Sequence, residues 1–178
     1  MKKLLNQLAL IFLLCAIASA CTSERVKNPV EKYVESLVKQ YPNYETNEIA
    51  RAAVKDSVMQ HMKAAVGKPS TDIQDVEFKF KRLVEDGDKK AALFEANVNT
   101  FNDVEGKESM MSSILIHALC VVDDETAAKL DGDKVYSISG TLDDWGENDL
   151  YMGISTTQTI DFGVLLFNHA TIEPIKAK

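Results

Sequence analysis

The densest group of side chains able to bind a metal ion lies in one loop near the end of the chain. Its oxygen-bearing side chains are Asp143, Asp144, Glu147, Asn148 and Asp149. Calcium takes roughly six to eight oxygen ligands, so the loop could begin a calcium site. The spacing differs from that of an EF-hand loop, and acidic loops are common in acidic chains. The sequence therefore favours solvated carboxylates, with calcium as the alternative.

Histidine is the other residue type that could support chemistry, and its three copies are His61, His117 and His169. A metal-assisted hydrolytic envelope enzyme would combine one of them with Asp143, Asp144 or Asp149. His117 and Cys120 would lie on opposite faces of a strand because their spacing is odd, so they cannot share a metal. The chain contains no nucleophile elbow, zinc-protease motif, phosphate-binding loop or dinucleotide fingerprint. A non-catalytic role is the favoured hypothesis.

Two aromatic groups could mark a binding surface. Tyr136, Trp145 and Tyr151 border the acidic loop and could form a contact patch, because interfaces favour aromatic side chains. The alternative is that they close the end of the core. A second group places Lys79, Lys81 and Arg82 beside Phe78 and Phe80, the nearest approach to a base-stacking surface. We interpret this second group as the solvent-facing side of one strand rather than as a base-stacking surface.

The first twenty residues predict an exported protein. A short basic start precedes an apolar run, Leu8 to Ile17, which is too short to span a bilayer. Ala18-Ser19-Ala20-Cys21 follows and resembles the lipobox of bacterial lipoproteins. That resemblance implies a signal peptide over 1–20, an acylated Cys21, and a lipid anchor and tether over 21–27. Cleavage by ordinary signal peptidase, leaving an unmodified Cys21, is the alternative.

Composition and charge limit the classes of partner. The chain has 178 residues, 46% of them hydrophobic and 26% charged, which fits one globular unit over 28–178 with a real core. The formal charge is −7, and it becomes −9 once the leader with Lys2 and Lys3 is removed. Such a surface repels nucleic acid and anionic headgroups. We expect membrane contact through the lipid anchor alone.

Residues 28–70 predict a helical hairpin. Asn28, Pro29 and Glu31 form a capping box with proline at the first helical position. An apolar stripe follows, and Pro42 ends the helix. The second helix runs from about residue 46 to 66, with Thr46 or Asn47 as its cap and Gly67 after its end. Two such helices are expected to pack as an antiparallel pair against a sheet.

Residues 71–178 change to the two-residue period of β-strands. The first two strands flank the turn at Asp86-Gly87-Asp88. The segment 112–122 is apolar on both faces, which predicts a central strand with the helices on its second face. A short helix is expected over 123–130, and a clear final strand over 164–175.

The second half resembles the OB-fold proteins, in particular small exported bacterial proteins with a tRNA-anticodon-binding-like barrel. The run from Lys129 to Gly140, with its Leu-Asp-Gly-Asp turn before a strand, carries the likeness, together with the segment from Leu165 to Ile172. The resemblance implies an α+β protein whose helix pair packs on a five- to seven-stranded antiparallel OB-like barrel over 71–178. Such barrels bind oligonucleotides, oligosaccharides or proteins across one face.

These expectations combine into one hypothesis about function. We expect a membrane-anchored, non-catalytic binding or accessory lipoprotein of the bacterial cell envelope, at the outer membrane or the periplasmic face. Its partner would be a protein or an envelope glycan, without nucleic acid and without a cofactor. The metal-assisted hydrolase and a structural subunit of an envelope complex are the alternatives.

Overall fold

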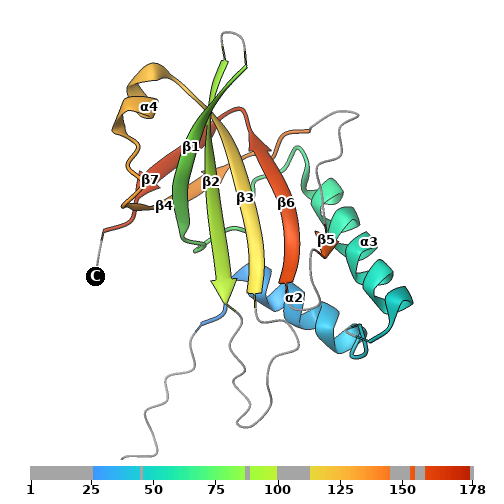
Figure 1. Ribbon diagram of the computed structural model, residues 1–178. Coiled ribbons are helices and arrows are strands. Elements are labelled where there is room, and N and C mark those ends of the chain that lie inside the picture. Colours follow the sequence, from blue (N-terminus) through green and yellow to red (C-terminus); the bar gives the residue numbers. More distant parts are fainter. Residues whose placement is uncertain are drawn as a thin grey trace, which may run out of the picture.

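The computed structural model describes residues 26–44, 46–86, 89–99, 113–144, 153–154 and 159–176. The fold is α+β, with helices and one curled sheet (Figure 1). The helices are α2 (Pro29–Gln40), α3 (Glu48–Ala65) and α4 (Asp124–Lys129). The strands are β1 (Phe78–Asp86), β2 (Lys89–Asn99), β3 (Ser113–Val122), β4 (Val135–Gly140), β5 (Gly153–Ile154), β6 (Thr159–Phe167) and β7 (Ala170–Pro174).

The helices begin where local chemistry predicts. The Asn28 side chain accepts the Glu31 backbone N–H at 2.9 Å, and the Glu31 carboxylate accepts the Asn28 N–H at 2.9 Å. This confirms the capping box of α2. Asn47 caps α3, and Asp123 caps α4. Among the described residues, no helix has the length and apolar character needed to cross a membrane.

The sheet has the strand order β5-β6-β3-β2-β1-β4-β7. Strands β1, β2 and β3 form an antiparallel meander, and β4 returns to lie beside β1. The placement of β4 beside β1 gives these four strands the order of a Greek key. An isolated bridge between Asp143 and Leu166 joins the chain after β4 to β6, so the sheet curls towards closure.

The prediction of an all-antiparallel sheet is wrong at one pair of strands. β6 runs parallel to β3, with Ser113 opposite Thr159 and Cys120 opposite Phe167. Between β3 and β6 the chain forms α4 and β4. It then returns to the other edge of β3, and β6 runs in the same direction as β3. The predicted final strand is also divided, because its first part pairs with β3 as β6 and its second part pairs with β4 as β7.

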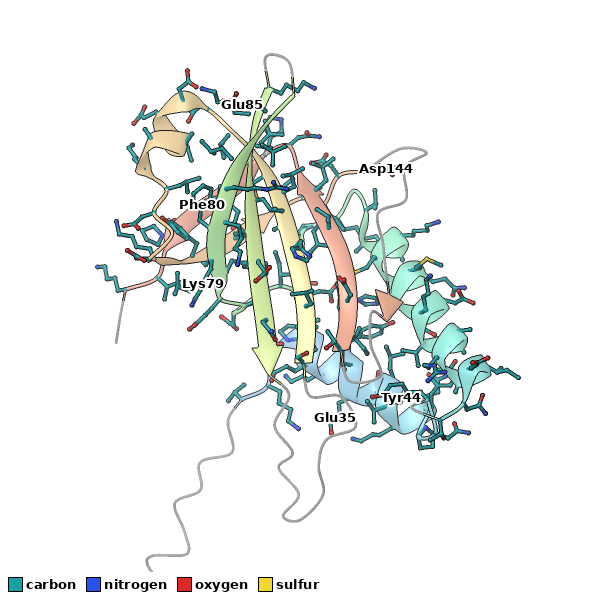
Figure 2. The ribbon with its side chains drawn as sticks, viewed as in Figure 1. Glu35, Tyr44, Lys79, Phe80, Glu85 and Asp144 are labelled. Carbon is teal, nitrogen blue, oxygen red and sulfur yellow. The ribbon has the colours of Figure 1, made fainter. Side chains whose placement is uncertain are left out.

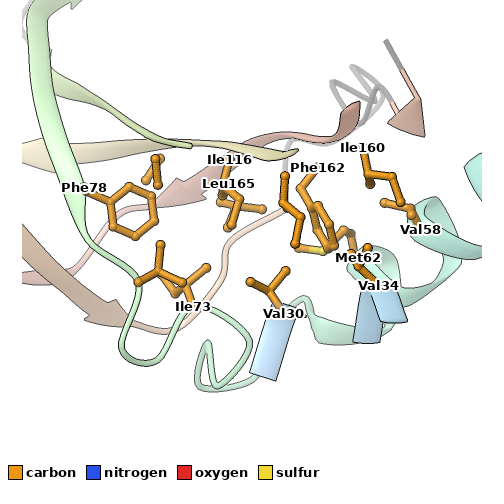
Figure 3. Close-up of a cluster of buried hydrophobic side chains, with 14 of the residues drawn as sticks. Val30, Val34, Val58, Met62, Ile73, Phe78, Ile116, Ile160, Phe162 and Leu165 are labelled. Carbon is orange, nitrogen blue, oxygen red and sulfur yellow. The ribbon is translucent and has the colours of Figure 1, made fainter. Parts of the chain in front are cut away.

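The hydrophobic core fills the concave side of the curled sheet. Figure 3 shows Ile116 and Leu165 pointing from the strands towards the side of the core that holds Val34 of α2 and Met62 of α3, whereas Phe78 lies over Ile73. The buried residues of α3 are Ala50, Val54, Val58 and Met62, as the helical period predicts. Helices α2 and α3 also contact each other, through a hydrogen bond that the Tyr33 hydroxyl donates to the Ser57 carbonyl at 3.0 Å. One core therefore joins the helices to the sheet.

The other side of the central strands carries no helix in the described part of the chain. On β3, Ile114, Ile116, Ala118 and Cys120 are buried, whereas the alternate residues from Leu115 to Val121 are half-buried. The prediction that helices cover the second face of this strand is wrong, because both long helices fill the concave side (Figure 1). We call the uncovered side the outer face.

Candidate binding face

A straight row of five residues crosses the outer face. Direct partners across neighbouring strands are Arg82 and Leu93, Leu93 and Leu119, and Leu119 and Leu166. The isolated bridge then pairs Leu166 with Asp143. Partners in a ladder project to the same side of a sheet. We call this set, Arg82, Leu93, Leu119, Leu166 and Asp143, the leucine row.

The direction of the row follows from the burial of its neighbours. Ala92 and Phe94, on either side of Leu93, are 0% exposed, and so are Ala118 and Cys120 beside Leu119. Because successive side chains alternate between faces, Leu93 and Leu119 project outward. Both are half-buried, whereas Arg82 is exposed. An apolar strip with a cation at one end and a carboxylate at the other therefore lies on the outer face.

The neighbouring rows extend this apolar strip on one side and border it with charge on the other. Val84, Ala91 and Val121 form an aligned row beside the leucines. On the opposite side, Glu95 binds Lys81 at 3.1 Å and lies 3.6 Å from His117. Contiguous apolar surface with a polar rim is typical of protein contact sites. Figure 2 shows Lys79 at the β1 flank and Asp144 beyond the β6 flank of this face.

The acidic loop is described only at its beginning. The Asp143 carboxylate accepts the Asn168 backbone N–H at 2.6 Å, which fixes the turn between β6 and β7. Asp144 is exposed, and Glu147, Asn148 and Asp149 lie outside the described residues. Within the described ranges, His, Cys, Asp and Glu side chains form no group of three that could hold a metal. Calcium therefore stays a prediction, and the described role of Asp143 is structural.

Tyr136 does not belong to an exposed contact patch. Its side chain is 3% exposed, and its ring packs edge-on against Phe94 at a centroid distance of 5.6 Å. The Tyr136 hydroxyl accepts the Asp131 N–H at 2.8 Å, so it fixes the turn before β4. The prediction of Tyr136 as a binding residue is therefore wrong, because its hydroxyl has a partner inside the fold. Trp145 and Tyr151, its predicted companions, lie outside the described residues.

Cys21 and Cys120 differ in whether the structure describes them. Cys21, the predicted lipidation site, lies outside the described residues. Cys120 is a free cysteine on β3 and is 0% exposed. Burial raises the pKa of its thiol to about 12, which keeps it protonated and unreactive at neutral pH. Cys120 and His117 lie on opposite faces of β3, as their spacing predicts.

The histidines have separate surroundings. His61 Nε2 lies 3.0 Å from the Asp72 carboxylate, and its ring stacks on Tyr33 at a centroid distance of 4.0 Å. Burial, and then the charge of Asp72, raises the pKa of Tyr33 to about 12. His169 is exposed in the β6–β7 turn, beside an open cleft of about 380 Å³ that reaches the end of β3. The His61 cluster joins α2, α3 and the segment after α3, so its described role is packing.

The cations of β1 do not stand beside exposed aromatic rings. Phe78 is 0% exposed, and Phe80 packs edge-on against Phe94 at 5.7 Å. Both rings belong to the concave side, so neither forms a stacking surface with Lys79 or Arg82. From the sequence, Lys81 and Arg82 were interpreted only in this nucleic-acid context, and the leucine row was not predicted. The signal for it was the pair of apolar faces in segment 112–122.

Comparison with known proteins supplies no relative from which a role could be transferred. No protein-family model, no curated protein and no solved structure matches the chain.

Proposed function

We propose that this chain is a lipid-anchored, non-catalytic binding or accessory protein of the bacterial cell envelope, and that its outer face binds a protein. The observation that carries the proposal is the half-buried apolar strip of Leu93, Leu119 and Leu166 on central strands of the sheet, over which no helix of the described part of the chain lies. Exposing such a strip costs solubility, so it is retained where a partner covers it. The lipobox-like segment ending at Cys21 supports the anchor.

We also propose that the curled sheet is an OB-like barrel with an antiparallel helix pair packed on it. The Greek-key order of β1 to β4, the helix α4 between β3 and β4, and the bridge from Asp143 to β6 support this assignment. The contact of Tyr33 near the start of α2 with Ser57 and His61 in the second half of α3 supports the pairing of the helices. In OB-folds the face of strands 2 and 3 binds the ligand.

A protein fits the outer face better than an envelope glycan does. Leucine and valine side chains bury well against other aliphatic side chains. Glycans and nucleotides are bound through aromatic platforms, and the rings of Phe78, Phe80 and Phe94 in this sheet belong to the core. The rim around Glu95 adds ionic groups that select the orientation of a protein partner.

The anchor and the binding face are tested separately. Intact mass of the protein purified from native membranes should show a diacylated or triacylated Cys21, and an unmodified N-terminal cysteine would contradict the anchor. The binding face is tested by crosslinked pull-down of the full-length protein from those membranes, with Leu119→Asp as the variant. We expect a stoichiometric partner that Leu119→Asp loses.

Leu83→Asp is the matched control for that pull-down. Leu83 is a leucine of the same sheet and is 40% exposed, but it pairs with Ala92 and belongs to the concave side. The control should keep the partner. Equal recovery from wild type and Leu119→Asp would show that the outer face does not bind it.

A further inference from the structure

We propose that the outer face is the contact surface between two copies of this chain, related by a two-fold axis that passes beside Leu119. This inference rests on the proposed function, because it names the protein that covers the outer face. The leucine row has a symmetric order of residue types, and its two ends carry opposite charges.

The leucine row is self-complementary. Leu119 stands at its centre, Leu93 and Leu166 stand one strand away on either side, and Arg82 and Asp143 stand two strands away. A two-fold contact brings the same patch of both copies together in reversed order. Leu119 then meets Leu119 of the other copy, Leu93 meets Leu166, and Arg82 meets Asp143. Within the leucine row, every apolar position faces an apolar one, and each charge faces its opposite.

Both end groups are available for this pairing. Arg82 is exposed and has no ion-pair partner among the described residues. Asp143 uses Oδ2 to accept the Asn168 N–H, which leaves Oδ1 as an acceptor at the edge of the row. Arg82 is a cation beside apolar surface in a chain of formal charge −7, and within the described ranges no carboxylate pairs with it, so it is suited to a carboxylate of another molecule.

The curl of the sheet determines which contacts are made directly. Strands lie about 4.8 Å apart, so the row spans about 19 Å along a convex surface. The three leucines lie at the crest and form the direct contact, whereas the two ends fall away from the other copy. The long, flexible Arg82 side chain can cross that gap to Asp143, as a shorter cation could not.

A two-fold symmetric dimer also accounts for the apolar strip better than a head-to-tail assembly does. A two-fold contact covers both strips at once and leaves none exposed, whereas a head-to-tail contact would continue into filaments. Isologous dimers are the commonest oligomers of soluble domains. The geometry therefore points to a second copy of the chain as the occupant of the outer face.

The test uses full-length protein in its native membranes with the substitution Leu119→Cys. Two thiols beside a two-fold axis approach each other, so mild oxidation should give a disulfide-linked species of twice the monomer mass. Wild type and Leu83→Cys are the controls, since Cys120 is buried and Leu83 belongs to the concave side. Mass spectrometry of the linked species should identify two copies of this chain and one bond between the introduced thiols.

The outcomes separate this inference from the proposed function. A homodimer with Leu119→Cys and none with the controls supports the two-fold contact. Absence of the homodimer, while the pull-down still recovers another protein that Leu119→Asp loses, overturns the two-fold contact and leaves the proposed function in place. Absence of both overturns the two together.

The ends of the row give a second test that preserves the leucines. Arg82→Glu places two carboxylates opposite each other at both ends of the contact, so sedimentation of the detergent-solubilised protein should show a dimer weakened about tenfold. Lys79→Glu makes the same change of charge in the neighbouring row, where its partners are Glu95 and then His117, and it should weaken the dimer less than Arg82→Glu. Equal effects of the two variants would contradict the alignment of Arg82 with Asp143.

Discussion

The two faces of β3 are built from the same kinds of side chain and differ in how far they are buried. Ile114, Ile116, Ala118 and Cys120 are 0% exposed and form part of the core, whereas Leu115, Leu119 and Val121 are half-buried. The difference lies in what covers them, because α2 and α3 fill the concave side alone. Apolar side chains on one face of a strand therefore indicate that the face must be covered. They do not indicate whether the same chain supplies the covering element.

The titratable groups divide between the interior and the solvent-exposed surface. On the concave side, burial raises the pKa values of Tyr33 and Cys120 to about 12. At the surface, hydrogen bonds lower the pKa values of Glu35, Asp123 and Asp131. The interior should therefore limit stability at alkaline pH, and the surface at acid pH.

Truncating one residue on each face of β3 should give the largest contrast. Ile116→Ala opens a cavity in the packed core and should lower the free energy of unfolding by about 3 kcal/mol. Leu119→Ala removes a half-buried side chain and should cost about 1 kcal/mol or less in the monomer. Urea unfolding at low protein concentration measures both values. Similar losses would show that the outer face is covered as tightly as the core.

The close approach of Gly140 to the β6–β7 turn should be the next most sensitive feature. A Cβ at Gly140 would lie 2.7 Å from the His169 carbonyl oxygen, so the β6–β7 turn would have to move. Gly140→Ala should destabilise the protein by about 1–3 kcal/mol. At Gly132 the nearest atom is 3.9 Å away, and Gly132→Ala is the matched control with little cost. Thermal unfolding compares the two, and equal midpoints would contradict this close approach.

Removing the Tyr33 hydroxyl should have a smaller effect that depends on pH. Tyr33→Phe loses the hydrogen bond to the Ser57 carbonyl and should cost about 1 kcal/mol at neutral pH. The folded pKa of about 12 exceeds the ordinary value of 10.0, so the unfolded chain ionises first as pH rises. Wild-type stability should therefore fall between pH 10 and 12, and less steeply in the variant. Unfolding midpoints across that range test this, and parallel curves would contradict it.

The smallest effect is expected at the acid end. The Asp131 carboxylate accepts the Asp133 N–H at 3.0 Å and lies 3.4 Å from Lys134 Nζ. These contacts hold the pKa of Asp131 below 3.8, so its contribution is present above that pH and is lost as pH falls further. Asp131→Asn should reduce the dependence of stability on pH in this acid range. An unchanged dependence, measured by urea unfolding at each pH, would count against that contribution.

The elements that depend on neighbours in sequence could be predicted. The capping box at Asn28 and the cap at Asp123 involve residues three positions apart, and both are confirmed. The parallel pairing of β3 with β6 could not be predicted in this way, because it joins residues about 46 positions apart. Alternation showed that segment 112–122 is central but not which side the helices would fill.

The candidate site was harder to predict for a related reason. Arg82, Leu93, Leu119, Leu166 and Asp143 come from five separate segments and become a row only through strand register. Tyr136 was predicted as a binding residue because interfaces favour aromatic side chains, yet its hydroxyl accepts the Asp131 N–H five residues earlier. Such a return contact depends on the path of the turn, which residue type alone does not reveal.

The parallel pairing of β3 with β6 also has a kinetic consequence. The meander of β1, β2 and β3 joins consecutive segments and can form early, as can α2 and α3. The register of Ser113 with Thr159 must wait for a long loop to close, which costs more conformational entropy. Until then the concave side lacks Phe162, Leu165 and Phe167. We therefore expect the joining of β6 to the meander to set the folding rate of the whole domain.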